Sequence, residues 1–442
     1  MTKTAAAARP PGLRTDLRTL VALGAGLLIT LWMADQIGMN LFMAVVLWVL
    51  IAVRTVLHEN KMALLGTLIA LAAWAILLPF FQDSGDPFLE DAVQALALTV
   101  MALGLNIIVG FAGLLDLGYV AFYALGALTA GWFMSGFFVS AGGGEGFSLL
   151  VGAPASELPG LHMNFLIVIL IAVVVTTIAG MLIGLPTLRL RGDYIAIVTL
   201  AFGEIVGRLV INGDEIVIGG QKVTNGRQGI TPIDKIDLPF ADPFQSLNLR
   251  PWFWTALAMV LLSLFVNYRL RDSRLGRAWI ALREDEVAAA SMGVPLVKTK
   301  LLAYGTGAAF GGMSGAFLAS LNNTVNADQF LFSFSIFILA MVILGGLASI
   351  EGVVLGAIVL TYINFRLIPD VLNDVPGKVG LDFDLTELSF GIFGFLIVMM
   401  MVLRPEGLIP ERRRKLELVE HIGTGETTGV GGAEESVYEG RA

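Results

Sequence analysis

The sequence RDSRLGRAWIALREDEVAAASMGVP, residues 271–295, is the densest run of charge between the long apolar segments of this chain. Its pattern predicts a short amphipathic helix that stops at Gly293 and Pro295, because glycine and proline commonly end helices. A chain built mainly of apolar segments has little use for such a helix in its middle. We therefore expect a soluble partner to bind it.

Long apolar segments flank this helix on both sides. Of the 442 residues, 56% are hydrophobic and only 14% are charged, and the mean hydropathy is +0.80, whereas a soluble domain carries about a quarter charged residues. Apolar runs of about 16–23 residues recur, which is the length of a bilayer-spanning helix, and they lack the alternation of a membrane β-barrel. We predict an all-α, polytopic transmembrane helical bundle of about 10–12 spans, including broken or re-entrant helices.

The predicted spans cover most of the chain. They lie at residues 17–34, 39–56, 62–81, 90–110, 119–138, 163–185, 193–211, 252–267, 299–321, 333–346, 352–365 and 388–403. Glycine interrupts the tracts 90–138 and 333–365, so either could contain half helices or re-entrant segments.

Basic residues set the orientation of these spans. Cytoplasmic connections carry an excess of Lys and Arg, and a cytoplasmic N-terminus gives the inner side most of the 28 such residues. Both termini and the charged helix then face the cytoplasm. We expect residues 212–250 to form a structured outer loop, and the Gly- and Glu-rich residues 406–442 to form a disordered cytoplasmic tail.

Several kinds of site are not predicted. The chain has no cysteine, and its histidines, His58, His162 and His421, lie far apart, so we expect no metal site. It lacks the phosphate-binding pattern G-x-x-x-x-G-K-[ST], so nucleotide hydrolysis of that type must come from another polypeptide. No catalytic motif stands out, which disfavours a membrane enzyme, and nothing predicts a nucleic-acid partner.

The charged helix has two interpretations. A helix that lies on the inner leaflet typically has a polar face rich in Lys and Arg. Here the polar face is mixed, because Asp272 and the acidic residues 284–286 stand among the arginines. This mixture favours a protein groove over anionic lipid, and small residues at 288–291 would let another surface approach closely.

Five stretches resemble one family, the ABC importer permeases of the branched-chain amino acid type, specifically their LivM-like subunit. They are GRAWIALREDEVAAASMGV (276–294), which looks like the cytoplasmic coupling segment, LGLNIIVGFAGLLDLGYVAFYALGALTA (103–130), LRLRGDYIAIVTLAFGEI (188–205), TNGRQGI (224–230) and ILGGLASIEGVVLGAI (343–358). In one departure, the general importer pattern E-A-A-x-x-x-G would place a glutamate at Val287, whereas Glu286 lies one position earlier.

The resemblance divides the chain into three parts. Residues 1–89 are an N-terminal extension with about three transmembrane helices. Residues 90–405 are the importer permease core, which contains the coupling segment 268–300, and residues 406–442 are the tail. The coupling residues that the resemblance implies are Gly276, Arg277, Ala278, Leu282, Arg283, Glu284, Glu286, Ala289 and Gly293.

The resemblance implies a transport subunit rather than an enzyme. It would move branched-chain or other neutral amino acids across the bacterial inner membrane by alternating access. The implied partners are a second related permease, two cytoplasmic ATPases that bind ATP and Mg, and a periplasmic substrate-binding protein, while this chain binds no cofactor. Urea or short amides are alternative substrates. An ion-coupled secondary transporter that uses Glu204 is a less favoured alternative.

Glycine-rich tracts supply most of the candidates for the translocation pathway, and the span 193–211 supplies Glu204. Glycine at this density permits either a broken helix that lines a cavity or plain close packing, and both readings stay open. The candidates are Asn106, Gly110, Gly113, Asp116, Tyr119, Glu204, Gly345 and Gly346.

Glu204 raises a separate question because it falls near mid-membrane in the span 193–211. An ionisable residue at that depth is a functional hypothesis by default. Arg208 follows four residues later and can pair with it along one helix face. The spacing favours a self-neutralising pair that fixes helix packing, and proton coupling through Glu204 is the alternative.

Overall fold

The computed structural model describes residues 26–27, 30–35, 38–56, 70–138, 146–151, 159–187, 194–238, 243–373, 388–404 and 406–409. Contacts divide the chain into two compact units, Met1–Ala92 with Leu247–Trp254, and Val93–Ser246 with Thr255–Ala442. Most of the predicted first span, the acidic residues 374–387 and the tail from residue 410 lie outside the described residues.

Among its described residues, the first unit contains two apolar helices that match predicted spans. They are α2 (Leu41–Val56) and the helix Ala70–Phe81, which ends in the 3-10 turn η1 (Leu78–Phe81). Trp254, at the start of α8, donates from its indole nitrogen to the Ile76 carbonyl at 3.1 Å. The extension therefore packs on the beginning of α8 through a helix end.

The second unit holds the remaining elements, and α4 and α8 enter it from the first. In chain order the elements are α4 (Pro87–Asn106), the π-helical turn η2 (Ile107–Phe111), α5 (Val120–Phe133), β1 (Met134–Ser135), β2 (Phe147–Leu149), β3 (Leu161–Met163), α6 (Phe165–Thr187), α7 (Tyr194–Ile211), β4 (Val217–Ile218), β5 (Gln221–Lys222), η3 (Gly226–Gln228), α8 (Arg250–Arg271), α9 (Arg274–Glu284), α10 (Glu286–Ser291), α11 (Leu296–Asn322), η4 (Ala327–Phe330), α12 (Phe332–Gly345), α13 (Ile350–Tyr362), the π-helical η5 (Ile363–Leu372) and α15 (Ser389–Leu403).

Helix α11 is the centre of the second unit, where it packs against α5 and α6. Small residues make this approach possible. A Cβ on Gly312 would collide with Thr176 of α6, and a Cβ on Gly315 would collide with the Tyr123 carbonyl of α5. Glycine at helix contacts lets backbones approach in this way, so part of the glycine content serves packing.

The predicted all-α membrane architecture is confirmed. Within the described residues, five helices are long and apolar enough to cross a membrane, and shorter apolar helices accompany them. The five are Pro87–Phe111, Phe165–Thr187, Tyr194–Ile211, Arg250–Arg271 and Ile350–Pro369. Only 22% of the most apolar window of α6 is buried inside the chain, as suits a helix that faces lipid.

Both glycine-rich tracts contain the predicted breaks. The first passes from α4 through η2 into an irregular connection at 112–119, and then into α5. The second leaves the helical path between α12 and α13, where Gly346 has φ +119° and Ala348 has φ +66°. The 14 residues of α5 and of α12 extend only ~21 Å, which is less than the ~30 Å hydrocarbon core.

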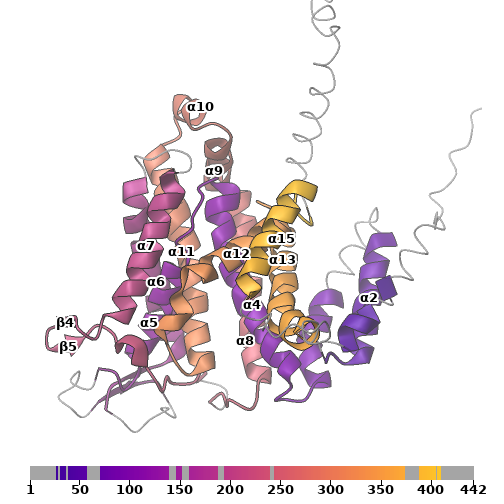
Figure 1. Ribbon diagram of the computed structural model, residues 1–442, viewed down its shortest axis with the longest axis horizontal. Helices are drawn as coiled ribbons and strands as arrows, with labels where there is room; N and C mark the ends of the chain where they lie inside the picture. Colours follow the sequence, from indigo (N-terminus) through magenta and orange to yellow (C-terminus); the bar gives the residue numbers. More distant parts are fainter. Residues whose placement is uncertain are drawn as a thin grey trace, which may run out of the picture. The chain divides into compact units, whose positions relative to one another are not determined.

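The two ends of the second unit differ in content (Figure 1). Helices α9 and α10 lie at one end, and the hairpin β4–β5 lies at the opposite end. The hairpin belongs to the predicted outer loop, whose described residues 212–238 are structured as expected. A small sheet, in the order β1–β3–β2, follows α5 where the prediction continued a helix to residue 138, so that span was predicted too long.

Candidate functional site

The charged segment forms two helices instead of the one predicted. Helix α9 ends at Glu284 and α10 begins at Glu286. Between them Asp285 has an extended backbone, with φ −155° and ψ 112°, and its carboxylate accepts hydrogen bonds from the amides of Val287 and Ala288. An aspartate in this position caps the following helix. The prediction of one continuous helix is therefore wrong.

The end of the segment is as predicted. Val294 N donates to the Ala289 carbonyl, and Gly293 N donates to the Ala290 carbonyl, both at 3.0 Å. Gly293 has φ +84°, so these bonds form the Schellman motif that commonly ends helices at glycine. Pro295 follows and directly precedes α11.

Helix α9 lies on the bundle through a buried face. Trp279 is fully buried, and its indole nitrogen donates to the Thr299 carbonyl of α11 at 2.9 Å. Leu282 is buried on the same face. At Gly276 the turn from α8 into α9 is so tight that a Cβ would collide with the last carbonyls of α8, which explains the requirement for glycine.

Arg283 points into the bundle. Its Nη1 donates to the Gly110 carbonyl at 2.9 Å, and its Nη2 donates to Glu284 Oε1 at 2.9 Å. Its stem lies against Gly113, where a Cβ would be 2.5 Å from Arg283 Cγ. Arg277, on the same helix, is exposed and donates to the Asp272 carbonyl at 2.9 Å.

Helix α10 is tied to the bundle by an ion pair. Lys300 Nζ, at the start of α11, lies 2.7 Å from Glu286 Oε1. The side chain of Lys300 is 3% exposed and that of Glu286 is 30% exposed. A nearly buried ammonium needs such a partner, because removing it leaves an uncompensated charge. Glu286 thus has a structural partner although it lies one position before the general importer glutamate.

The opposite side of the segment is exposed and partly apolar. Val287 is 61% exposed and Met292 is 88% exposed, while Ala289 is buried beneath them. Val287 follows the break at Asp285 and faces away from the bundle.

The glycine-rich breaks meet beneath this segment. Asn106, at the end of α4, accepts a hydrogen bond from the Ala348 amide at 3.0 Å. Gly110 packs so closely that a Cβ would collide with the Asn106 side chain and would be 2.7 Å from Ala348 N. Gly345 and Gly113 belong to the same two breaks. Part of the predicted pathway set is therefore gathered at the end that carries α9 and α10.

Residues 406–409 cover the second break. Leu408 N donates to the Leu344 carbonyl at 2.9 Å, and Ile409 N donates to the Gly345 carbonyl at 3.1 Å. At Gly346 a Cβ would be 2.8 Å from the Ile409 carbonyl oxygen. Backbone donors that follow α15 therefore complete the end of α12.

Asp116 lies in the connection 112–119, outside the spanning helices. It is 2% exposed. Its Oδ1 accepts from the Gly118 amide at 2.9 Å, whereas its Oδ2 has no hydrogen-bond partner among the described residues. Burial raises the pKa of Asp116 to about 6, although the Gly118 amide and the Thr199 hydroxyl counteract this shift. Tyr119, the next candidate, is fully buried and donates to the Gly307 carbonyl of α11 at 2.8 Å.

A small cavity lies between α9, α10 and this connection, beside the contact of Arg283 with Gly113. Its volume is about 190 Å³, and its lining combines apolar residues with three charged side chains. The lining includes Leu114, Leu115, Ile195, Arg283, Glu286 and Lys300. The charged segment therefore contacts the bundle through a few polar side chains around this cavity, in addition to the buried contact of Trp279 with α11.

Glu204 and Arg208 do not form the predicted pair. Both side chains are exposed on α7, and none of the ion pairs in the described ranges joins them. Ile197 and Ile205 share this exposed face, at 60% and 56% exposure. The i, i+4 spacing permits the contact without enforcing it. A role for Glu204 in the pathway stays a prediction.

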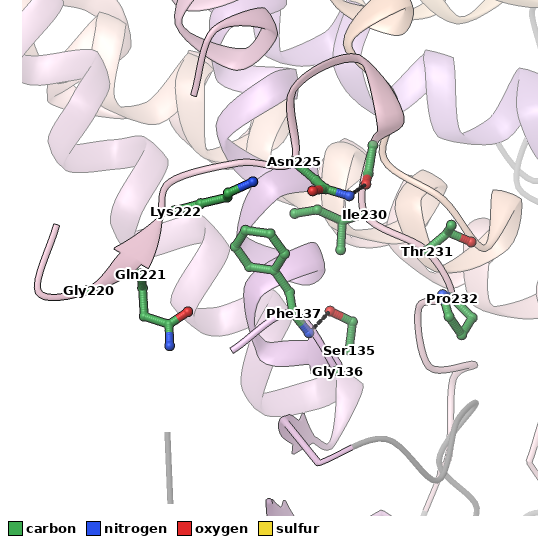
Figure 2. Close-up of a pocket in the computed structure, with 11 residues that line it drawn as sticks. Ser135, Gly136, Phe137, Gly220, Gln221, Lys222, Asn225, Ile230, Thr231 and Pro232 are labelled. Atoms are coloured by element: carbon green, nitrogen blue, oxygen red, sulfur yellow. Dashed lines mark hydrogen bonds between the residues drawn. The ribbon is translucent and has the colours of Figure 1, made fainter. Parts of the chain in front are cut away.

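A second cavity lies at the opposite end of the unit, between the β4–β5 hairpin and the turn after α5 (Figure 2). Its volume is about 340 Å³. Phe137 and Lys222 lie on its wall, and Asn225 donates to the Gly229 carbonyl at 3.0 Å beside it. Lys222 gives the wall of this cavity, the mouth at Lys222, a positive charge.

A model of the branched-chain amino acid transport system permease component family matches residues 88–401. The chain belongs to this permease family. The LivM permeases of the high-affinity branched-chain amino acid transport systems of Salmonella typhimurium and Escherichia coli are 36% and 37% identical to it over 388 residues. These matches cover 83% of this permease and 79% of each relative.

A second kind of permease is also similar. The LivH permease protein of E. coli is 30% identical over 122 residues, which is 27% of this chain and 38% of LivH. No solved structure matches the chain.

Two residues of this permease's site were missed by sequence reasoning. Trp279 and Lys300 hold α9 and α10 to the bundle. The tryptophan could have been noticed, because a large aromatic residue within an amphipathic segment commonly marks its buried face. The lysine carried no signal, because at the start of a span it looks like any cytoplasmic flanking charge.

Proposed function

We propose that this chain is a transmembrane permease subunit of an ATP-driven ABC importer that moves branched-chain or other neutral amino acids into the cell. Its family is a transport component, and the substrate class is carried over from the names of its LivM relatives. The chain itself hydrolyses no nucleotide in this proposal. It lies in the bacterial inner membrane with both termini in the cytoplasm.

The proposed assembly contains a second, related permease, and the similarity to LivH supports that subunit. Two cytoplasmic ATPases bind ATP with Mg and dock on the coupling segments of the two permeases. A periplasmic binding protein delivers the substrate to the outer loops, where the mouth at Lys222 is one place for it to touch. The two permeases share the translocation pathway.

The exposed face of α10 is the observation that carries this proposal. Val287 and Met292 are 61% and 88% exposed at the tip of a charged segment, and the exposed acids Glu284 and Asp285 lie beside them. Exposed apolar side chains rimmed by charge are typical of a protein docking surface, whereas anionic lipid would repel the acids. ATPase closure would push α10, and the membrane helices would change between outward-open and inward-open arrangements.

The pathway candidates have two proposed places. Asn106, Gly110, Gly113, Asp116, Gly345 and Gly346 would form the cytoplasmic end of the pathway, where the two broken helices meet. Glu204 would face the pathway or the second permease from the exposed side of α7. Tyr119, buried between α5 and α11, would act only through packing.

Purification through a tag on this chain, expressed with its neighbouring genes, tests the proposal. Two ATPase subunits and a second permease should co-purify, and proteoliposomes should take up leucine only with ATP and the binding protein. An ATPase that cannot hydrolyse ATP is the matched control, because it should assemble but not transport.

The alternatives predict different results. Uptake by this chain alone, driven by an ion gradient and abolished in Glu204→Gln, would establish a secondary transporter and contradict the proposal. Competition separates the substrate classes: excess isoleucine and valine should suppress leucine uptake, whereas suppression by urea or acetamide would favour a permease for short amides.

A further inference from the structure

We propose that Arg283 is the positioning residue that links movement of the coupling segment, α9 with α10, to the broken helix α4–η2. This inference rests on the proposed function, in which an ATPase pushes α10. It assigns Arg283 to transmission inside the protein and leaves docking to the exposed side of α10.

The Gly110 carbonyl is available because the helix ends around it. In η2 the Ala112 amide bonds to the Ile107 carbonyl, and the Leu114 amide bonds to the Ile108 carbonyl, at 3.1 and 3.0 Å. These bonds bypass Gly110, whose carbonyl is one of the acceptors that a helix C-terminus leaves open. The guanidinium of Arg283 fills that place at 2.9 Å, and a cationic donor makes the bond stronger than a neutral one.

The contact is directional as well as strong. Gly113 has φ +68° and no side chain, so the Arg283 stem lies directly on the connection after η2. Glu284 holds the second nitrogen of the guanidinium at 2.9 Å. The guanidinium is therefore oriented from two sides, and displacement of α9 must either move Gly110 or break its hydrogen bond.

Gly110 passes such a displacement to both breaks. It packs directly on the Asn106 side chain and on the Ala348 amide, which are themselves hydrogen-bonded at 3.0 Å. One side chain of the coupling segment thus reaches the end of α4 and the connection between α12 and α13. The Glu286–Lys300 pair ties α10 to α11 separately, so loss of Arg283 leaves the segment attached.

The test compares Arg283→Met with Arg274→Met in the complete transporter in proteoliposomes. Methionine keeps much of the stem and removes the donors, and Arg274 is an exposed arginine on the same helix, outside the set of implied coupling residues. ATP hydrolysis and leucine uptake are measured on the same vesicles. In Arg283→Met, leucine transported per ATP should fall about tenfold or more, as loss of a charged hydrogen bond allows, with the ATPases still bound. Arg283→Lys should recover part of the ratio.

A second variant protects the test against misfolding. Gly113→Ala places a methyl group against the Arg283 stem and should lower the same ratio. Gly219→Ala introduces the same residue at a similar φ of +62° where nothing lies within 4 Å, so it should not. An unchanged ratio in both Arg283→Met and Gly113→Ala would overturn the inference, and loss of the ATPases from Arg283→Met would assign Arg283 to docking instead. If wild type lacks ATP-driven uptake, the proposed function itself fails, which is a separate result.

Discussion

Helices α9 and α10 are neighbours in one segment, yet they face opposite ways. Helix α9 buries Trp279 and turns Arg283 inward to the Gly110 carbonyl. Helix α10 keeps one inward ion pair through Glu286 and exposes Val287 and Met292. The turn at Asp285 makes this division possible, because a continuous helix could not rotate its second half.

In the proposed function, the difference separates two tasks of the coupling segment. A surface that docks an ATPase would have to remain exposed until the ATPase binds, and a connection to the membrane helices would have to be rigid. Placing the tasks on two short helices lets each have its own composition. The inward contacts should therefore affect stability, and the outward contacts should affect assembly.

Trp279→Ala should disrupt the packing of α9 on the bundle and cause the largest loss of stability. It removes a fully buried indole and its hydrogen bond to the Thr299 carbonyl, and such a truncation costs about 3–5 kcal/mol. Unfolding of the purified chain in SDS–detergent mixtures measures the loss. Trp279→Phe keeps an aromatic ring and loses the hydrogen bond, so it should cost much less stability. Equal losses in the two variants would show that packing of the ring does not hold α9 to the bundle.

Asp116→Asn should stabilise the protein at neutral and higher pH. Burial raises the pKa of Asp116 from 3.8 to about 6, so the folded protein favours the protonated acid. The wild type should therefore lose stability as the pH rises from about 4 to about 6, by on the order of 2–3 kcal/mol. The variant should lack that loss.

Stability measured from pH 4 to pH 8 checks this expectation. The advantage of Asp116→Asn should be present at pH 8 and vanish near pH 4. Asp272→Asn is the control, because that side chain is 72% exposed. A difference between Asp116→Asn and wild type that does not depend on pH would show that Asp116 is not the group that titrates.

Glu286→Gln should weaken the tie between α10 and α11 by an intermediate amount. It leaves the Lys300 ammonium, 3% exposed, without its carboxylate. We expect a loss of about 2 kcal/mol, below the ~3–5 kcal/mol of a fully buried pair, because Glu286 is partly exposed. Adding Lys300→Met should recover stability, and a double variant less stable than Glu286→Gln alone would argue against a simple ion pair.

The double variant Val287→Ala with Met292→Ala tests the exposed side of α10 and should have the smallest effect on stability. Both side chains are exposed, so the stability of the chain should change by less than ~0.5 kcal/mol. Co-purification of the ATPases should nevertheless fall. Retained ATPases with normal uptake would mean that the partner does not use this face.

Local signals in the sequence predicted the outline of these regions well. Long apolar runs predicted the all-α bundle, and glycine clusters predicted the breaks near Gly110 and Gly346. Gly293 and Pro295 ended the charged segment where they were expected to. Each of these signals acts within a few residues, which is the range over which a single sequence is informative.

The contacts that assemble the site could not be predicted in the same way. Arg283 and Gly110 are 173 residues apart in the chain, and only the packed fold brings them together. The capping role of Asp285 was readable in principle, because aspartate is a preferred N-cap, but the acidic run hid it. Glu204 and Arg208 show the reverse error, because a favourable spacing does not require a bond on an exposed helix face.

The backbone bonds from residues 408 and 409 to the end of α12 have a practical consequence for handling this protein. A chain cut after Arg404 would leave the Leu344 and Gly345 carbonyls without these donors, even though the described spanning helices would be intact. An affinity tag fused there would replace residues 406–409 and their hydrogen bonds to the end of α12. Tags and fluorescent fusions therefore belong beyond residue 409.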